Sequence, residues 1–453
     1  MPKDSAGGST DERIKKICLD DVPTPLSVQA LIDNHKDNYV SRYERLQRYY
    51  EGYNDILSRS KSDTSKPNNK IVSGYASYIV DMAQGYFLGK PVSYSSTDED
   101  LMGSLQDIFN YNDEQDENSE LTKMAGIKGR AYEIVYVDEE AKVRFNEVDA
   151  DNIIVAYDTK INPNINFAIR YFELNNPLNS NGILMADVYT KDTIYRYQQG
   201  DMGLNLIEEV PHYFGQVPII EFMNNDEGIG DFERVISLID AYDKSQSDTA
   251  NDFEEFTDAF LCLVNMNATE DEDIKKLATD KILLLDKEGQ AYWLIKEIND
   301  IALENYKNRL KQDIHKFSKT PDMSDEQFAS NASGIAMAYK TLALEQVMAS
   351  KERKFKRGLQ KRIELICTIL NIQGNQFDYR DVDIKFTRNV PVNVKEQVET
   401  ATMLRGFTSY STALTELPMV DDVTLELEKM EQEKAAYEAS GGVDLDAIEV
   451  GEE

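Results

Sequence analysis

Three histidines and three cysteines are the residues of this chain best suited to metal binding or nucleophilic catalysis. They are scattered along the 453 residues, at His35, His212, His315, Cys18, Cys262 and Cys367. Structural zinc sites draw their ligands from closely spaced pairs, and the sequence contains no such pair. The odd number of cysteines also argues against a secreted disulfide framework. These residues therefore predict neither a zinc site nor a disulfide scaffold.

One glycine-rich segment superficially resembles a phosphate-binding loop. Gly85 and Gly89 precede Lys90, but the spacing is one residue short, and Pro91 replaces the hydroxyl residue that would hold magnesium. The segment also ends a helical pattern rather than opening one. The G-x-S-x-G signature of an activated serine is absent from the sequence as well. We expect no catalytic residues, no metal and no cofactor.

Acidic residues dominate the charged side chains. Asp and Glu number 82 against 49 Lys and Arg, so the formal net charge is −33. This balance excludes a basic module that neutralises phosphates over its surface, but it does not exclude a protein that encloses DNA without gripping it. Acidic pairs are so frequent that none is selected as a divalent-metal site.

Two clusters of basic residues stand out against this acidic background. The first comprises Lys307, Arg309, Lys311, Lys316 and Lys319. The second comprises Lys351, Arg353, Lys354, Lys356, Arg357, Lys361 and Arg362. Each cluster could be a solvated helix face or pair with neighbouring acids. Alternatively, each could contact a polyanion or an acidic surface of a neighbouring subunit.

The first half of the chain predicts helices followed by strands. Residues 1–24 are polar and expected to be flexible. Helical apolar spacing covers residues 25–53, resumes over 71–89 and returns over 119–129. Residues 131–224 contain short β-branched and aromatic segments separated by turn residues. We expect these segments to form one antiparallel sheet region that packs on the preceding helices.

The second half is distinguished by a helix–insert–helix order. Apolar spacing predicts a helix over 231–259, a small α/β insert, and a second helix over 300–318. We expect the insert to hold a strand at 261–266, an acidic helix at 270–278 and a hairpin that turns at Lys287, Glu288 and Gly289. A polar loop then leads to the longest predicted helix, over 334–370.

The C-terminal part predicts a strand near 382–386, a helical region over 394–439 and a disordered acidic tail over 440–453. The fold class is therefore α+β. The polar N-terminus predicts no signal peptide, and no apolar run approaches the ~20 residues of a membrane helix. We expect a protein made and kept in a reducing cytoplasm, with no membrane partner.

Several segments, taken in order, resemble the portal proteins of tailed bacteriophages, in the branch found in long-tailed phages of Gram-positive bacteria. The segments are Asn68–Val72, Tyr78–Asp81, Gly85–Val92, Phe214–Phe222 and Ser333–Tyr339. The resemblance covers roughly residues 25–435. The resemblance rests on the order of these segments within the helix–insert–helix plan.

The resemblance implies a homo-oligomeric ring, commonly of twelve subunits, that surrounds a channel at one capsid vertex. The parts would be a wing (25–230), a stem helix (231–262), a clip (263–298), a second stem helix (299–319), a tunnel loop (320–333), a long helix with a wing strand (334–393) and a short crown (394–439). Double-stranded DNA would pass through the channel during packaging and ejection.

Partners and location also follow from the resemblance. The ring would dock the terminase large subunit and later a head-completion protein, and would contact the major capsid and scaffolding proteins. The protein would belong to the virion, after assembly in the host cytoplasm. An acidic channel wall would fit this function, since strong phosphate binding would slow the sliding of DNA.

The resemblance assigns roles to four groups of residues. The tunnel loop would use Thr320, Asp322, Ser324, Asp325, Glu326, Gln327, Ser330 and Asn331. The clip would bind partners near Asp271, Glu272, Lys287, Glu288 and Trp293, although Trp293 is a better candidate for the clip core. The two basic clusters would lie on the second stem helix and the long helix.

Two other functions remain as alternatives. A metal-dependent hydrolase with a helical cap would need converging ligands that the sequence does not identify. A cytoplasmic coiled-coil scaffold would need heptads sustained over three to four repeats, which no segment provides.

Overall fold

The computed structural model of the chain describes most of its residues. They are residues 16–63, 66–174, 182–256, 260–264, 290–294, 300–323, 334–389, 394–404, 407–415, 417, 420 and 423–439. The chain divides into two compact units. Unit 1 comprises residues 1–322 and 343–389, and unit 2 comprises residues 323–342 and 390–453.

Unit 1 begins with the helices that the apolar spacing after Pro25 predicts. The Thr24 hydroxyl caps α1 (Pro25–His35) by accepting a hydrogen bond from the backbone amide of Ser27. A π-helical turn (Lys36–Val40) joins α1 to α2 (Ser41–Tyr50). The predicted continuous helix is therefore present, with one local widening.

The next helices differ in part from the prediction. α3 (Tyr75–Leu88) begins after Ile71, which lies in an extended segment instead. α4 (Glu99–Tyr111) is a helix that we did not predict, and Asp98 caps it. α5 (Glu114–Lys128) starts earlier than the predicted 119, because its first turn is acidic rather than apolar and gives no periodic signal.

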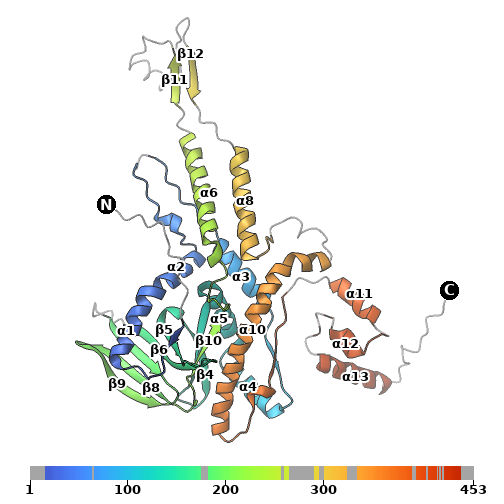
Figure 1. The fold of residues 1–453 in the computed structure, drawn as a ribbon. Coiled ribbons are helices and arrows are strands. Elements are labelled where there is room, and N and C mark those ends of the chain that lie inside the picture. The colour runs from blue at the N-terminus through green and yellow to red at the C-terminus, as the bar shows by residue number, and fades with distance from the viewer. Residues whose placement is uncertain are drawn as a thin grey trace, which may run out of the picture. The chain divides into compact units, whose positions relative to one another are not determined.

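The strands form two main sheets rather than the single sheet region predicted. The larger sheet has the order β1-β5-β6-β7-β8-β9. Its strands are β1 (Ile17–Cys18), β5 (Ile153–Tyr157), β6 (Ile165–Leu174), β7 (Ile183–Tyr189), β8 (Thr193–Gly200) and β9 (Gly203–Pro211). Val28 and Ile32 of α1 pack on this sheet against Phe167, Ile169 and Val188 (Figure 1).

The smaller sheet has the order β10-β3-β4, with β10 (Ile219–Met223), β3 (Arg130–Val137) and β4 (Val143–Val148). The prediction was wrong about a single sheet because β4 does not pair with β5. The chain turns instead through a short 3₁₀ segment (Ala150–Asn152), and β10 returns to pair with β3.

Part of the N-terminal segment is ordered, contrary to the expectation of flexibility over residues 1–24. β1 pairs in parallel with β5, and Leu19 N donates to Tyr157 O at 2.9 Å. Asn166 Nδ2 donates to the carbonyls of Leu19 and Asp20. A strand of two residues carries no periodic signal, so the sequence pattern could not reveal it.

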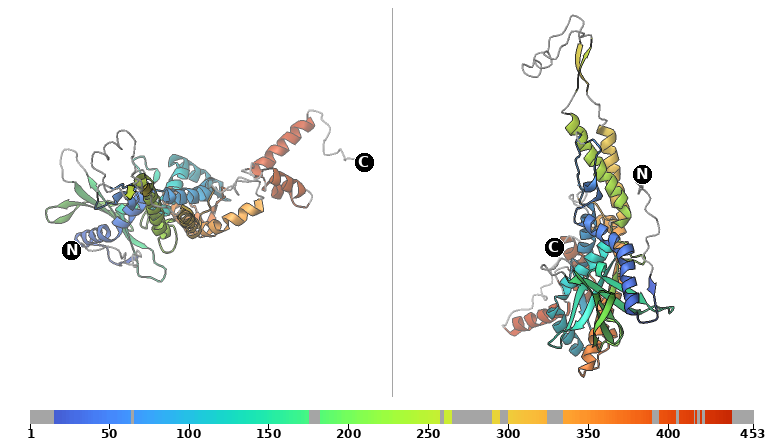
Figure 2. Two further views of the ribbon diagram at one scale, coloured as in Figure 1. Left: turned by 90° about the horizontal axis from the view of Figure 1, so that it is seen from above. Right: turned by 90° about the vertical axis from the view of Figure 1, so that its left-hand side faces the viewer.

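Two helices, α6 (Ile236–Phe256) and α8 (Asp300–Ser318), lie side by side in Figure 1 and in the right-hand view of Figure 2. A 3₁₀ turn (Glu233–Val235) precedes α6. The bounds of α8 match the prediction. Beyond α6, β11 (Phe260–Val264) pairs with β12 (Gln290–Leu294), so part of the predicted insert is a two-stranded ribbon. The predicted helix at 270–278 and the turn at Lys287–Gly289 lie outside the described residues.

α10 (Gly334–Ile372) is the long helix that the sequence predicts. Phe355, Leu359 and Ile363 of this helix are buried in the largest core cluster, together with Phe87 and Phe222. β13 (Asp383–Lys385) confirms the predicted strand and pairs with β2 (Ser93–Ser95). The described helices of unit 2 after residue 390 are α11 (Val394–Leu404), α12 (Tyr410–Thr415) and α13 (Val423–Ala439).

Candidate functional site at the root of the paired helices

The start of α6 and the end of α8 are held in one apolar cluster, which we call the helix root. Phe232, Val235 and Ile239 pack there with Ile314 of α8 and Ile79 of α3. All five side chains are buried. Burial of apolar surface is worth ~25 cal/mol per Å², so contacts among these side chains stabilise the packing of α6 against α8 and α3. The cluster thereby fixes the position of the N-terminal end of α6 and the C-terminal end of α8.

An arginine on α2 fixes the 3₁₀ turn at the start of α6. Arg42 forms two parallel hydrogen bonds with the carboxylate of Glu233, at 2.7 and 2.6 Å. Its Nη2 also donates to the carbonyl of Gly228 at 2.9 Å, and Gly230 N donates to Glu233 at 2.9 Å. The bidentate pair is geometrically specific, so it orients the turn as well as stabilising it.

A buried ion pair ties α10 to the same place. Lys351 Nζ lies 2.8 Å from Asp231 Oδ2, with side-chain exposures of 4% and 7%. Asn224 Nδ2 donates to the other carboxylate oxygen at 2.8 Å. A Cβ on Gly126 would lie 2.8 Å from Asp231 Oδ2, so a larger residue at this position of α5 would have to displace the paired carboxylate.

Residues 69–73, which we call the strap, form an extended segment that runs along α6 and is hydrogen-bonded to it at every second residue. Its backbone amides donate to side chains of α6, from Ser73 to Asp243 (2.8 Å), from Ile71 to Ser247 (2.9 Å) and from Asn69 to Asn251 (2.7 Å). Four helical residues advance ~6 Å and two extended residues advance ~6.6 Å, so the two repeats match. The strap thus binds the middle of α6 to the body of unit 1.

The C-terminal end of α8 is anchored where the predicted tunnel loop begins. Lys319 adopts a left-handed conformation (φ 60°), which ends the helix. His315 Nδ1 lies 3.1 Å from the carbonyl of Thr320, so that ring nitrogen carries the proton, and Tyr78 donates to the carbonyl of Pro321 at 2.9 Å. Lys311 lies 2.7 Å from Asp322. The first residues of the loop are therefore held by both α8 and α3.

The first basic cluster is largely paired within the chain. Lys307 is buried and lies 3.0 Å from Glu304, Arg309 lies 3.0 Å from Asp313, and Lys311 pairs with Asp322. Lys316 and Lys319 are exposed near the end of α8. These two lysines are the members of the cluster best placed to meet an external anion.

Most of the predicted tunnel loop and clip lies outside the described residues. Thr320 is buried and Asp322 is partly buried. The remaining loop residues, Ser324, Asp325, Glu326, Gln327, Ser330 and Asn331, are not described, nor are Asp271, Glu272, Lys287 and Glu288. Trp293 lies on β12, where its backbone is paired opposite Leu261. The roles assigned to these residues stay predictions.

The second basic cluster mostly makes intramolecular contacts, which is one of the two alternatives the sequence left open. Besides Lys351, Lys354 pairs with Asp226, and Lys356 Nζ donates to the carbonyl of Ile384 at 2.9 Å. Arg353 and Arg357 are exposed on the same helix. The long helix therefore does not present a continuous basic face.

Arg362 cannot belong to an exposed basic patch, because its side chain is only 1% exposed. It donates to Glu133 at 2.6 and 2.9 Å, and to Glu114 at 3.1 Å. Burial raises the pKa of Glu133 despite this partner. The burial of Arg362 could have been predicted from the sequence, because Arg362 lies on the same helical face as the buried Leu359 and Ile366. No pattern in the sequence identified Glu133 and Glu114 as its partners.

Within the part of the chain that the structure describes, no three histidine, cysteine, aspartate or glutamate side chains gather in a way that could hold a metal ion. Among the same residues, no helix is long and apolar enough to cross a membrane. The helix root is therefore an assembly of apolar contacts and ion pairs that positions two long helices and the base of a loop.

Two kinds of comparison relate this chain to known proteins. Among solved structures, the neck of an empty gene transfer agent particle matches with a TM-score of 0.46 and 10% identity, over 76% of this chain and 90% of the other. The virion of a native gene transfer agent particle matches with a TM-score of 0.47 and 11% identity, over 83% and 93%. Similarity at this level carries no assignment by itself.

The sequence comparisons are more informative. The portal protein of Bacillus phage SPP1 is 26% identical over 456 residues, covering 94% of this chain and 89% of the relative. The portal protein of Clostridium phage phiCD119 is 26% identical over 431 residues, covering 88% and 94%. The family described as phage portal protein, SPP1 Gp6-like, matches residues 29–439. The chain belongs to this family of phage portal proteins.

Proposed function

We propose that this protein is a portal subunit that forms a ring at one capsid vertex and provides the channel for packaging and ejection of double-stranded DNA. The observation that carries the proposal is the match to the portal family over residues 29–439. The portal family is a structural one, and we propose that this member has no enzymatic activity. ATP hydrolysis would be left to a terminase.

Closure of a ring requires a surface on each subunit that fits a different surface on the next. Tyr306 and Phe317 support this proposal, since they are 51% and 55% exposed on α8. They lie three helical turns apart and therefore on the same flank of the helix. We assign this flank to the interface between neighbouring stems, where the aromatic rings would be buried.

We also assign the tunnel loop to residues 320–333, at the narrowest part of the channel. The anchoring of Pro321 and Asp322 to Tyr78 and Lys311 supports this assignment, because it gives the loop a fixed base. Exposed Lys316 and Lys319 would steer the phosphate backbone near that base. With a net charge of −33 per subunit, the rest of the wall would not bind phosphates strongly.

The remaining assignments rest on the family and on element order. The ribbon of β11 and β12 would belong to the clip, which would dock the terminase large subunit and then a head-completion protein. The helices α11 to α13 would form the crown. The ring would contact major capsid and scaffolding proteins, assembling in the host cytoplasm before it joins the virion.

The mass of the purified protein in solution tests the proposal, measured across a range of salt and protein concentrations. The expected result is one large closed oligomer, commonly of twelve subunits for this family. A species that stays monomeric in every condition, including with scaffolding protein present, would contradict it. Phosphodiester hydrolysis that one carboxylate substitution abolishes would instead favour a metal-dependent hydrolase.

The tunnel-loop assignment has its own test. Deletion of residues 324–330 retains Pro321 and Asp322 and therefore the anchored base of the loop. Rings should still form, while packaging or retention of DNA should fall strongly. Dissociated rings would place the loop in a subunit interface instead.

The clip assignment predicts that Trp293→Ala weakens terminase docking or clip folding. Wing stability, measured by the main unfolding transition, should change by less than about 0.5 kcal/mol. A variant with normal docking and a destabilised wing would contradict the assignment.

A further inference from the structure

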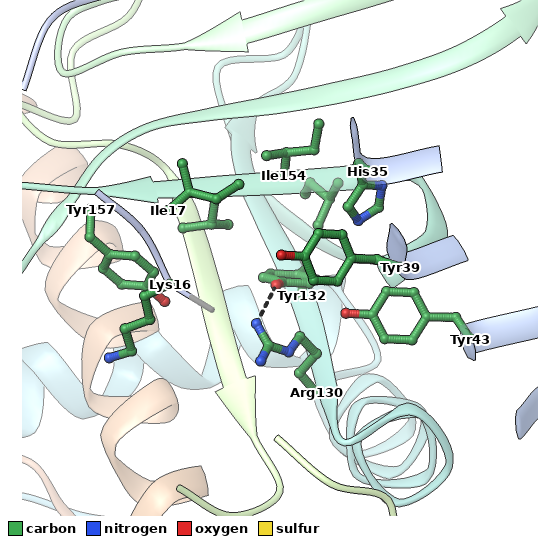
Figure 3. A pocket seen from close by; sticks show the side chains of 11 residues that line it. Lys16, Ile17, His35, Tyr39, Tyr43, Arg130, Tyr132, Ile154 and Tyr157 are labelled. Atoms are coloured by element: carbon green, nitrogen blue, oxygen red, sulfur yellow. Dashed lines mark hydrogen bonds between the residues drawn. The ribbon is translucent and has the colours of Figure 1, made fainter. Parts of the chain in front are cut away.

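A small cavity lies in unit 1 apart from the helix root and plays no part in the proposed function. Its volume is about 30 Å³. It is lined by Lys16 and Ile17 at the N-terminal strand, by Tyr43 of α2, by Arg130 and Tyr132 of β3, and by residues of β5 (Figure 3). That volume holds about two waters or one larger ion, and it excludes nucleotides and other organic ligands.

The carboxylate beside the cavity already has partners on both of its oxygens. Glu221 Oε1 accepts hydrogen bonds from Arg130 Nη1 at 3.1 Å and from Tyr132 at 3.2 Å. Glu221 Oε2 accepts a short hydrogen bond from Tyr157. Because both oxygens of Glu221 already accept hydrogen bonds, any other donor that lines the cavity needs a different acceptor.

Arg130 has a donor left over. Its side chain is buried, with the residue 8% exposed, and Nε finds no acceptor among the described residues. A buried donor without a partner costs about 1–3 kcal/mol, and more when it carries charge. An acceptor within the cavity would remove this cost.

Tyr43 adds a second donor on the same side. Its hydroxyl is directed toward Tyr132 and Arg130 in Figure 3. Burial is the main reason that the pKa of Tyr43 rises to about 12, so the phenol keeps its proton and can donate. Two donors from separate elements, α2 and β3, thus converge on the cavity.

The positive charge of Arg130 also acts on His35, which lines the same cavity. Burial first, and then this charge, lower the pKa of His35 to about 4, so the imidazole is neutral at physiological pH. Its Nδ1 lies 2.8 Å from Tyr171, whose hydroxyl donates to the carbonyl of Asp151, so Nδ1 carries the proton. Lys16 lies at the cavity with Nζ 4.8 Å from the Tyr157 ring centre. Arg130 and Lys16 thus line this space, and the carboxylate of Glu221 lies beside it through its hydrogen bond from Arg130.

We propose that the cavity binds a single chloride-sized anion, held by Arg130 Nε and the Tyr43 hydroxyl. Hydrogen bonds from a cation to an anion are roughly twice as strong as neutral ones, so an anion satisfies Arg130 better than water does. The ion would join α2 and β3. It would stabilise the packing of the two sheets in each subunit, whether or not the protein forms a ring.

Thermal unfolding of the full-length protein tests the proposal in sodium chloride and in sodium gluconate at matched ionic strength. The midpoint should rise with chloride and saturate. Tyr43→Phe removes one donor and keeps the ring, so the half-saturating chloride concentration should increase at least tenfold. Tyr213→Phe changes an exposed tyrosine outside the cavity and should respond like the unsubstituted protein.

A crystal of the unsubstituted protein grown in sodium bromide gives the direct readout. An anomalous peak within hydrogen-bonding distance of Arg130 Nε is the expected result. Water at that position, or equal chloride responses in Tyr43→Phe and the unsubstituted protein, would overturn the proposal. The diffraction result remains decisive even if Tyr43→Phe does not fold.

Discussion

The backbone amide of Ser73 donates a hydrogen bond to Asp243 across 2.8 Å, although the two residues are 170 positions apart. The Asn54 side-chain amide donates to the other oxygen of the same carboxylate. Burial is the main cause that raises the pKa of Asp243, and these hydrogen bonds act against it. This carboxylate fixes the C-terminal end of the strap on α6 and thereby connects one long helix to the rest of unit 1.

If the strap stabilises the fold, removing one of its acceptors on α6 should lower the free energy of unfolding. Ser247→Ala leaves the amide of Ile71 without its acceptor, so the free energy of unfolding should fall by about 1 kcal/mol. Urea unfolding measures this change. Ser237→Ala alters an exposed serine on the same helix and should change stability by less than about 0.5 kcal/mol. Equal effects of the two substitutions would contradict a stabilising role for the strap.

The buried network around Arg362 predicts a much larger effect. Arg362→Ala leaves Glu133 and Glu114 without their cation in the core, which should cost about 3–5 kcal/mol. Arg357→Ala, on the exposed face of α10, is the matched control and should cost less than about 0.5 kcal/mol. Chemical denaturation of both variants provides the comparison. A mild effect at Arg362 would mean that the network does not depend on this cation.

Glu147 predicts a dependence of stability on pH. Burial, together with repulsion from Asp149 and Glu120, raises the pKa of Glu147 from 4.5 to about 7. Between these values the folded state keeps a proton that the unfolded state has released, so stability falls as the pH rises. Glu147→Gln should therefore be more stable than the unsubstituted protein at pH 8, with the difference shrinking toward pH 5.

Urea unfolding at the two pH values measures the effect of Glu147→Gln. Glu139→Gln removes the same charge from an exposed position on the neighbouring turn and serves as the control. It should leave the pH dependence of the unsubstituted protein in place. The pKa assignment would be wrong if Glu147→Gln gave no gain in stability at pH 8.

The proposed stem interface predicts that assembly and folding can be separated. Phe317→Asp places a charge on the exposed flank of α8, so rings should be lost, because a buried unpaired charge is costly. The secondary structure of the subunit should be preserved. Asn308→Asp introduces the same charge at another exposed position of α8 and should still permit rings. Sedimentation and circular dichroism measure the two properties, and intact Phe317→Asp rings would remove this flank from the interface.

The helices with strong apolar periodicity could be predicted from sequence, and the contacts between distant segments could not. Leu303, Leu310 and Ile314 gave α8 its correct bounds, since their spacing follows the helical repeat. Ile71 was misplaced in a helix, because its hydrogen bond to Ser247 depends on a partner far along the chain. β1 was missed for the same reason, since only the edge of β5 makes it a strand.

The candidate site shows the same division. A loop after α8 was expected from the sequence, and its role as a tunnel loop stays a prediction. The residues that hold its first part, Tyr78 and His315, belong to different elements and had no local signal. Basic residues on α10 were visible in the sequence, but the acids that pair with them were not. Asp231 and Glu133 come from a turn and a strand that only the folded chain brings to that helix.

Rotationally averaged electron-microscope images of the purified full-length protein test the central claim most directly. Closed rings with a central channel and one dominant rotational symmetry are the expected result. Images of isolated subunits or open filaments, in all salt conditions and also with scaffolding protein present, would contradict this claim.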